Sequence, residues 1–224
     1  MKIDILTLFP EMFSPLKESI IGRAVKSGKV EIVITDIRDY STDKHKRCDD
    51  YTFGGGAGMV LMPEPVGNAI EAVDPNHEAR RIYMSPKGKR FSQKDVASLL
   101  SFERLLFLCG HYEGVDQRII DLFIDEEMSI GDYVLTGGEL PAMVITDAVC
   151  RYVDGVISKE SLKNETFTDN LVEYPQYTRP QIYRGLKVPD VIVSGDHAKV
   201  DRWRREKSLE LTGKLRPDLL EKDD

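Results

Sequence analysis

Residues 105–114 have the sequence LLFLCGHYEG, an apolar run followed by a loop that contains two glycines. A strand with apolar residues on both faces is typical of a parallel sheet that helices cover on both sides. On either side of this run, short apolar segments alternate with helical patterns, as in proteins built from repeated βα units. The sequence therefore predicts an α/β fold with a parallel sheet.

The expected elements of this fold lie mainly in the first two thirds of the chain. We expect strands at residues 2–9, 30–35, 81–84, 105–109 and 124–128. We expect helices at residues 15–27, 63–73, 93–101, 117–123 and 141–153. The last of these helices is apolar nearly all round, so we expect it to be buried in the core or in an interface.

The chain changes character after Gly155. Residues 158–170 are polar and lack clear periodicity, and prolines at 175, 180, 189 and 217 divide the rest of the chain into short pieces. One further helix is expected at residues 197–212, where Asp196 is placed to cap it. We therefore predict a first domain at residues 1–157, a flexible linker at 158–172 and a small helical domain at 173–224.

Composition restricts the class of protein. Of the 224 residues, 41% are hydrophobic and 31% are charged, which is typical of a soluble globular protein. No apolar run is long enough to span a bilayer, and the start of the chain lacks the form of a signal peptide. We therefore expect a cytoplasmic protein that contacts no membrane. The three cysteines are widely scattered, which suggests neither a disulfide framework nor a zinc cluster.

Charge is unevenly distributed along the chain. The formal net charge is −7, yet residues 179–216 hold ten basic and five acidic residues. Such a local excess of positive charge is typical of a surface that binds a polyanion. A solvated helix face has the same pattern, and charge alone does not separate the two interpretations.

Three glycine-bearing loops each follow an expected strand, at residues 85–89, 109–114 and 129–141. In open parallel sheets ligands bind beyond the carboxyl ends of the strands, so we expect these loops to line one pocket. Glycines there would let the backbone approach a flat ring closely. Three ordinary tight turns are the alternative interpretation.

Other motifs argue against several classes of enzyme. Residues 54–59, GGGAGM, lack the Lys-Ser/Thr of a phosphate-binding Walker loop, and no G-x-G-x-x-G motif follows a strand. This glycine cluster is either a mobile lid or a close-approach turn. Residues 45–50 include potential metal ligands, but nothing elsewhere has matching spacing, so a solvated loop is favoured. His111 is placed either to contact a ligand or to cap a turn.

With these loops the sequence resembles the bacterial tRNA (guanine-N1)-methyltransferases of the TrmD family, within the SPOUT superfamily. The matching segments span almost the whole chain in the expected order, at residues 4–10, 51–62, 83–88, 110–116, 125–141, 174–180 and 194–203. The longest specific matches are residues 130–141 and the PQYTRP motif at residues 175–180.

The resemblance implies a fold and a cofactor. The implied fold is a SPOUT-type parallel sheet with a C-terminal deep trefoil knot, followed by a small C-terminal helical domain. The knot holds S-adenosylmethionine, largely through backbone groups. The implied cofactor-binding residues are Tyr83, Pro86, Gly110, Tyr112, Glu113, Ile130, Gly131, Asp132, Tyr133, Val134, Leu135, Gly137, Gly138 and Pro141.

The resemblance also implies partners. The family forms homodimers with each active site at the subunit interface, and the apolar helix from Pro141 suits such an interface. The implied substrate is tRNA with a guanosine immediately 3′ of the anticodon. A dependence on Mg²⁺ is implied too, although the sequence shows no dedicated metal site. The implied tRNA-binding residues are Tyr177, Arg179, Arg202 and Arg205.

Methyl transfer to guanine N1 needs a base and a cation. N1 is protonated at neutral pH, so a carboxylate must accept its proton, and the charge that develops on O6 needs a fixed cation. The family's base is an aspartate in a Glu-Asp-Ser-Phe stretch, which aligns with Glu165 in the NETF segment of this chain. Asp169 is the alternative base. The matching cation is Arg151, which would also suit a helix C-terminus.

The resemblance thus predicts an enzyme, an S-adenosylmethionine-dependent tRNA (guanine-N1)-methyltransferase. Its product would be N1-methylguanosine immediately 3′ of the anticodon. The alternatives are a SPOUT methyltransferase for another RNA site and a non-catalytic RNA-binding protein.

Overall fold

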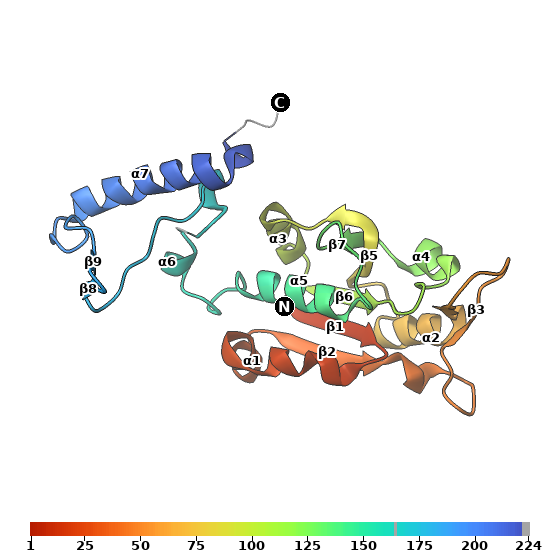
Figure 1. The fold of residues 1–224 in the computed structure, drawn as a ribbon. Helices are drawn as coiled ribbons and strands as arrows, with labels where there is room; N and C mark the ends of the chain where they lie inside the picture. Colours follow the sequence, from red (N-terminus) through yellow and green to blue (C-terminus); the bar gives the residue numbers. More distant parts are fainter. Residues whose placement is uncertain (164, 221–224) are drawn as a thin grey trace. The chain divides into compact units, whose positions relative to one another are not determined.

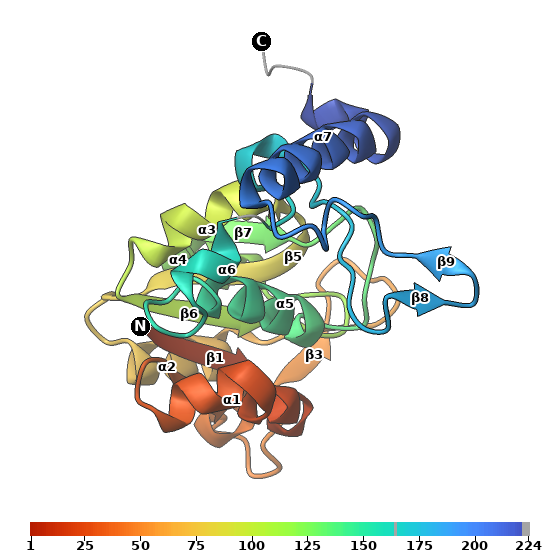
Figure 2. The same cartoon turned by 90° about the vertical axis from the view of Figure 1, so that its left-hand side faces the viewer.

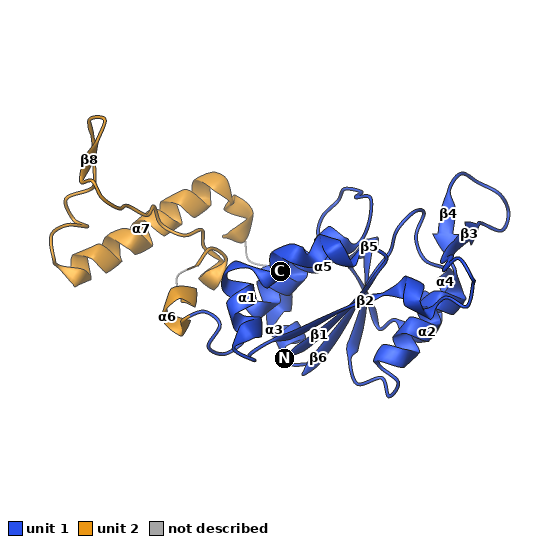
Figure 3. Cartoon of the chain, turned by 90° about the horizontal axis from the view of Figure 1, so that it is seen from below, with its two compact units in different colours: residues 1–157 blue, residues 158–224 orange. Residues whose placement is uncertain are grey.

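The computed structural model describes residues 1–163 and 165–220, and the chain divides into two compact units (Figure 3). The first unit is Met1–Ile157 and the second is Ser158–Asp224. Nearly all of the hydrophobic core belongs to the first unit. Among the described residues of the second unit, the buried apolar side chains are Leu171 and Val200.

The first unit is built on a five-stranded parallel sheet with the strand order β2-β1-β6-β5-β7 (Figure 1). Its strands are β1 (Lys2–Thr7), β2 (Glu31–Asp36), β5 (Arg80–Arg90), β6 (Arg104–Cys109) and β7 (Glu126–Ser129). All five expected strands are present, and the predicted α/β fold with a parallel sheet is confirmed. The strand β6 lies at the centre of the sheet, which explains its continuous apolar sequence.

Helices cover both faces of this sheet (Figure 2). They are α1 (Ser19–Lys26), α2 (Pro63–Val73), α3 (Gln93–Leu100), α4 (Gln117–Phe123) and α5 (Glu139–Cys150). Side chains of β6 alternate between the two faces, as strand geometry dictates. Leu105 and Phe107 pack with α1, α3 and α5, whereas Leu106 and Leu108 pack with α2 and α4. Over the described residues, no helix has the length and apolarity needed to cross a membrane.

Four helices differ from the expected bounds; α3 ends one residue early at Leu100, and the helix expected at residues 197–212 continues to Leu215. The helix expected at residues 15–27 begins only at Ser19, because Pro10–Lys17 forms a 3-10 helix that contains Pro15. Proline has no backbone N–H to donate inside an α-helix, and Ser19 has a φ of +53°, which separates the two helical segments. The helix expected at residues 141–153 is α5, which ends at Cys150 and is followed by turns.

An antiparallel hairpin of β3 (Asp49–Tyr51) and β4 (Met59–Leu61) was not expected from the sequence. Strands of three residues are too short to give a recognisable alternation. The loop of this hairpin carries the glycine cluster. The strand β4 is bound to the loop that follows β6, because Glu113 N donates to Met59 O at 3.0 Å and Leu61 N donates to Gly114 O at 3.0 Å.

The second unit is dominated by α7 (His197–Leu215), which begins where expected. Asp196 caps it, since its Oδ1 accepts from Lys199 N at 3.1 Å. The shorter elements of this unit are α6 (Lys159–Leu162), a 3-10 turn at Thr168–Asn170, β8 (Ile182–Tyr183), β9 (Leu186–Lys187) and a 3-10 turn at Pro217–Leu219. The expected linker at residues 158–172 is thus partly helical, and its flexibility stays a prediction.

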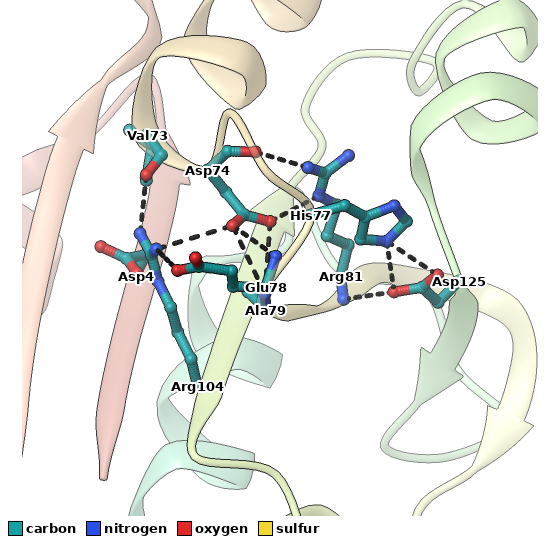
Figure 4. Close-up of polar contacts among 9 residues, drawn as sticks. All are labelled: Asp4, Val73, Asp74, His77, Glu78, Ala79, Arg81, Arg104 and Asp125. Carbon is teal, nitrogen blue, oxygen red and sulfur yellow. Dashed lines mark hydrogen bonds and ion pairs between the residues drawn. The ribbon is translucent and has the colours of Figure 1, made fainter.

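A buried ion network joins the amino-terminal parts of three strands (Figure 4). Asp74, which follows α2, is fully buried; its Oδ2 accepts from Arg81 Nε at 2.8 Å and its carbonyl oxygen accepts from Arg81 Nη2 at 2.6 Å. Arg104 Nε donates to Asp4 Oδ2 at 2.7 Å, and its Nη2 donates to Val73 O at 2.7 Å. Since Asp4, Arg81 and Arg104 belong to β1, β5 and β6, the network fixes one end of the sheet and leaves the carboxyl ends for the loops.

Candidate active site

A cavity of about 290 Å³ lies where β6 and β7 end and where β5 bulges. The bulge is residues 85–88, between Met84 and Lys89, which pair with the same residue of β7. The other walls are the loops at residues 110–115 and 129–138, with Pro141 of α5. The three glycine-bearing segments therefore line one cavity, although residues 85–89 form a bulge within β5 and not the expected loop after a strand. The volume of the cavity is close to the lower end of the range of about 300–1,000 Å³ for small-molecule sites.

The cofactor-binding residues that the resemblance implies line this cavity, with the exception of Asp132. The Asp132 side chain is 91% exposed and lies 3.9 Å from Arg90. Its neighbours Gly131 and Tyr133 line the cavity, so the chain at this point turns the Asp132 side chain outward.

Further lining residues come from the three expected loops, namely Ser85, Lys87, His111, Gly114, Ser129 and Thr136. The lining residues that the sequence analysis missed lie outside those loops: Met84, Val115, Gln117, Ile120 and Met128. Gln117 and Ile120 belong to α4, and their three-residue spacing directly after a glycine loop is a signal that could have found them.

Two glycines are required by close approaches near the cavity. A Cβ on Gly138 would lie 2.8 Å from Cys109 Cα, so any other residue would force the two loops apart. Gly58, in the β3–β4 hairpin, has a φ of +85°, and a Cβ there would lie 2.6 Å from the Glu113 side chain. Gly54 and Gly55 have open space at the Cβ position, so the close approach in this cluster is confined to Gly58, and both interpretations of the cluster stay predictions.

Tyr83 and His111 are two of the polar side chains that line the cavity. Burial, and then the nearby Glu127 carboxylate, raise the pKa of Tyr83 to about 12, so its hydroxyl stays protonated. The His111 ring packs 4.8 Å from the Phe9 ring and 4.9 Å from the Tyr112 ring, between centroids. His111 Nδ1 is buried and has no hydrogen-bond partner among the described residues. A buried polar atom normally has a hydrogen-bond partner, so a contact between His111 and a ligand stays a prediction.

Cysteine chemistry is excluded at this site. Burial raises the pKa of the Cys109 thiol well above its ordinary value, raises that of Cys48 to about 11 and raises that of Cys150 to about 12. All three stay as neutral thiols near pH 7, which are poor nucleophiles. Within residues 1–163 and 165–220, no group of three His, Cys, Asp or Glu side chains could hold a metal ion.

The candidate base and the candidate cation belong to different units. Arg151 is half-buried in the first unit and caps the C-terminus of α5. Glu165 is half-buried in the second unit, where it lines a cavity of about 450 Å³. Asp169, the alternative base, and Arg205 line this second cavity too.

Cations of the second unit fall into two groups. One group is paired with carboxylates, as in Lys163–Glu160, Lys187–Asp190, Lys199–Asp196, Arg204–Asp201, Lys207–Glu210 and Arg216–Asp218. In the part of the chain that the structure describes, the second group forms no ion pair within 4.0 Å, although the charge of Arg202 helps to lower the pKa of Asp196; the group includes Arg179, Arg184, Arg202 and Arg205. Three of these four are the predicted tRNA-binding arginines. The fourth predicted residue, Tyr177, lies beside Trp203, with ring centroids 6.3 Å apart.

The fold and the first cavity define a class, the α/β proteins that bind a ligand beyond the carboxyl ends of parallel strands. Residues 1–222 match a family described as tRNA (Guanine-1)-methyltransferase TrmD. The chain belongs to this family, as its loops predicted, and it is therefore a methyltransferase.

Relatives of the chain agree with this assignment. A protein named tRNA (guanine-N(1)-)-methyltransferase from Caldanaerobacter subterraneus subsp. tengcongensis is 55% identical over 224 residues, covering 99% of this chain and 92% of the relative. A protein of the same name from Geobacter sulfurreducens is 54% identical over 225 residues, with coverage of 99% and 92%. A third, from Ruminiclostridium cellulolyticum, is 55% identical over 226 residues, with coverage of 99% and 97%.

Proposed function

We propose that this methyltransferase transfers a methyl group from S-adenosylmethionine to N1 of the guanosine immediately 3′ of the anticodon in tRNA. The observation that carries the proposal is the single cavity formed by the three glycine-bearing loops in a chain of this family. As a tRNA-modifying enzyme it would act in the cytoplasm.

The residues around the first cavity fit this cofactor. The Tyr83 hydroxyl stays protonated and could donate a hydrogen bond, and the glycines of the lining loops, such as Gly110 and Gly137, expose backbone groups to the cavity. Ile130 and Leu135 supply apolar walls. When bound, S-adenosylmethionine would supply the methyl group on a sulfonium sulfur, which leaves as a neutral thioether. The implied contact with Asp132 would use its backbone, since its side chain faces away.

Two side chains would carry the proton and the charge. The Glu165 carboxylate would accept the proton from guanine N1 and leave the nitrogen lone pair free to attack the methyl carbon. The Arg151 guanidinium would stabilise the negative charge that develops on O6. The role of the protein is otherwise to hold N1 in line with the methyl group.

Recognition of tRNA would fall to the second unit. The arginines without carboxylate partners, Arg179, Arg202 and Arg205, are the side chains best able to bind phosphates. Tyr177 is 47% exposed and could stack on an unpaired base.

The architecture we propose follows the family resemblance. It comprises a trefoil knot in the cofactor loops, the domain division at residues 157 and 172, a requirement for Mg²⁺ and a homodimer with the active site at the interface. One observation supports the dimer: Leu140 and Val144 of α5 are each 48% exposed, which leaves an apolar face for a second copy.

The proposal is tested by incubating the protein with labelled S-adenosylmethionine and two unmodified tRNA transcripts. One transcript has guanosine immediately 3′ of the anticodon, and the matched transcript has adenosine there. We expect label in the first transcript alone, recovered as N1-methylguanosine after digestion.

Two other outcomes would reject the proposal. Label in a different nucleoside would indicate a methyltransferase for another RNA site. Binding of S-adenosylmethionine without label in either RNA would favour a non-catalytic RNA-binding protein.

A further inference from the structure

The hairpin of β8 and β9 projects from the second unit as a narrow loop (Figure 3). Its apolar side chains are not covered: Ile182 is 61% exposed, Tyr183 is 60% exposed and Leu186 is 78% exposed. Tyr183 pairs with Leu186 across the two strands, so these two side chains share one face. A two-stranded hairpin is marginally stable by itself, and one that buries none of these side chains is suited to a partner.

The charge around this hairpin is positive. Residues 174–189 contain Arg179, Arg184 and Lys187 and no acidic residue. Lys187 Nζ lies 2.5 Å from Asp190, which follows this segment. Arg184 has no carboxylate partner among the described residues, and its guanidinium lies 5.4 Å from the centroid of the Tyr183 ring.

Arg184 occupies an unusual backbone position. The turn consists of Arg184 and Gly185, with φ values of +50° and +85°, as in a two-residue turn of type I′. Asparagine, aspartate or glycine is usual at the first position, because other side chains are disfavoured at positive φ. An arginine there is held at the tip of a tight turn, with its guanidinium over the Tyr183 ring.

We propose that the tip of this hairpin, Tyr183-Arg184-Gly185, is a docking surface for the ribose-phosphate backbone of tRNA. The inference rests on the proposed function and extends it to a surface that the resemblance did not assign. A guanidinium makes paired hydrogen bonds to phosphate oxygens, and the Tyr183 ring would restrict its orientation. The absence of acidic residues from residues 174–189 favours a polyanion over a second protein chain.

The test is the affinity of the full-length protein for unmodified tRNA, measured by fluorescence anisotropy over a series of salt concentrations. Arg184→Ala should weaken binding several-fold. The plot of log affinity against log salt should become less steep by about 0.9, the value for one lost phosphate contact on a duplex. Affinity for S-adenosylmethionine should not change. Lys187→Ala is the matched control in the same hairpin, and its effect should be smaller because Asp190 already neutralises this ammonium.

Failure of this proposal is distinguishable from failure of the proposed function. If the wild-type protein methylates tRNA and Arg184→Ala has wild-type affinity and slope, the hairpin is not a docking surface. If Leu186→Ser changes the oligomeric state in sedimentation while Arg184→Ala leaves tRNA affinity unchanged, the hairpin belongs to an interface between copies of this chain. If the wild-type protein methylates no tRNA, the proposed function itself is wrong.

Discussion

The two units of this chain use charged residues in opposite ways. In the first unit, Asp74 and Arg81 form an ion pair whose side chains are 0% and 6% exposed. In the second unit the ion pairs join neighbours in sequence on exposed surfaces, as in Lys207–Glu210. Exposed pairs of this kind contribute little to stability, whereas a buried charge that loses its partner is strongly destabilising.

This difference indicates a structural role for the buried charges of the first unit and a binding role for the exposed arginines of the second. Burial opposes ionisation of Asp74, but hydrogen bonds from Arg81 and from the backbone of Glu78 and Ala79 outweigh it, so the pKa of Asp74 lies below its usual value. The buried charges of the first unit therefore join strands at the end of the sheet away from the cavity. The arginines of the second unit that form no close ion pair are the cations best able to bind a polyanionic partner.

The largest expected effect comes from the candidate base in the second unit. Glu165→Gln removes the proton acceptor, so we expect the single-turnover rate of methyl transfer to fall by about 10²–10⁴-fold. The rate is measured by rapid quench with both substrates saturating. Affinities for tRNA and S-adenosylmethionine should stay near wild type.

Asp169→Asn is the matched control, because Asp169 lines the same cavity and is the alternative base. We expect it to retain a rate near that of the wild-type enzyme. A collapse of the rate in Asp169→Asn, with a normal rate in Glu165→Gln, would reverse the assignment of the base.

The next largest effect is on stability and lies in the first unit. Asp74→Ala leaves Arg81 buried without its partner, so we expect the free energy of unfolding to fall by about 3–5 kcal/mol. Urea denaturation followed by circular dichroism measures this change. Glu210→Gln, which breaks an exposed pair in α7, should leave the unfolding midpoint unchanged. Equal losses in the two variants would contradict the contrast between the units.

A smaller effect is expected in the pH dependence of stability. Because the pKa of Asp74 is lower in the folded state, its contribution is present above its unfolded pKa of about 3.9 and is lost as pH falls through the folded value. The free energy of unfolding should therefore decrease as pH drops below about 4. Asp74→Asn should show a shallower decrease in urea titrations at several pH values. If the free energy of unfolding of Asp74→Asn decreases with falling pH as steeply as that of the wild type, Asp74 is not the cause of the pH dependence.

Much of the fold could be predicted because local patterns decide it. The expected helices at residues 63–73 and 117–123 match α2 and α4, and the apolar run at 105–109 is the central strand. The β3–β4 hairpin could not be predicted, since its strands are held by the loop after β6 rather than by their own pattern. The ion network was also beyond sequence reasoning, because Arg104 and Asp4 lie 100 residues apart.

The candidate site likewise has some features that the sequence predicts and others that it does not. The three loops could be predicted from their positions after strands, and so could the cavity that they line. The unpartnered state of His111 Nδ1 depends on tertiary packing that no sequence pattern records. The distinction between paired and unpaired arginines in the second unit likewise needs side-chain geometry, although the local excess of positive charge was visible in the sequence.

The central claim is that the first unit binds the cofactor and the second binds tRNA, and a crossed pair of double variants tests it most directly. Tyr133→Ala with Leu135→Ala removes two exposed side chains from the first cavity, and Arg202→Ala with Arg205→Ala removes two unpaired cations from α7. Affinities for S-adenosylmethionine and for tRNA are measured on both proteins.

The account predicts that each double variant loses one affinity and keeps the other. The cavity variant should bind S-adenosylmethionine about tenfold more weakly, equivalent to about 1.4 kcal/mol, and bind tRNA normally. The arginine variant should bind tRNA more weakly, with a salt slope lower by about 1.8, and bind S-adenosylmethionine normally. Equal loss of both affinities in either variant would contradict the division of labour.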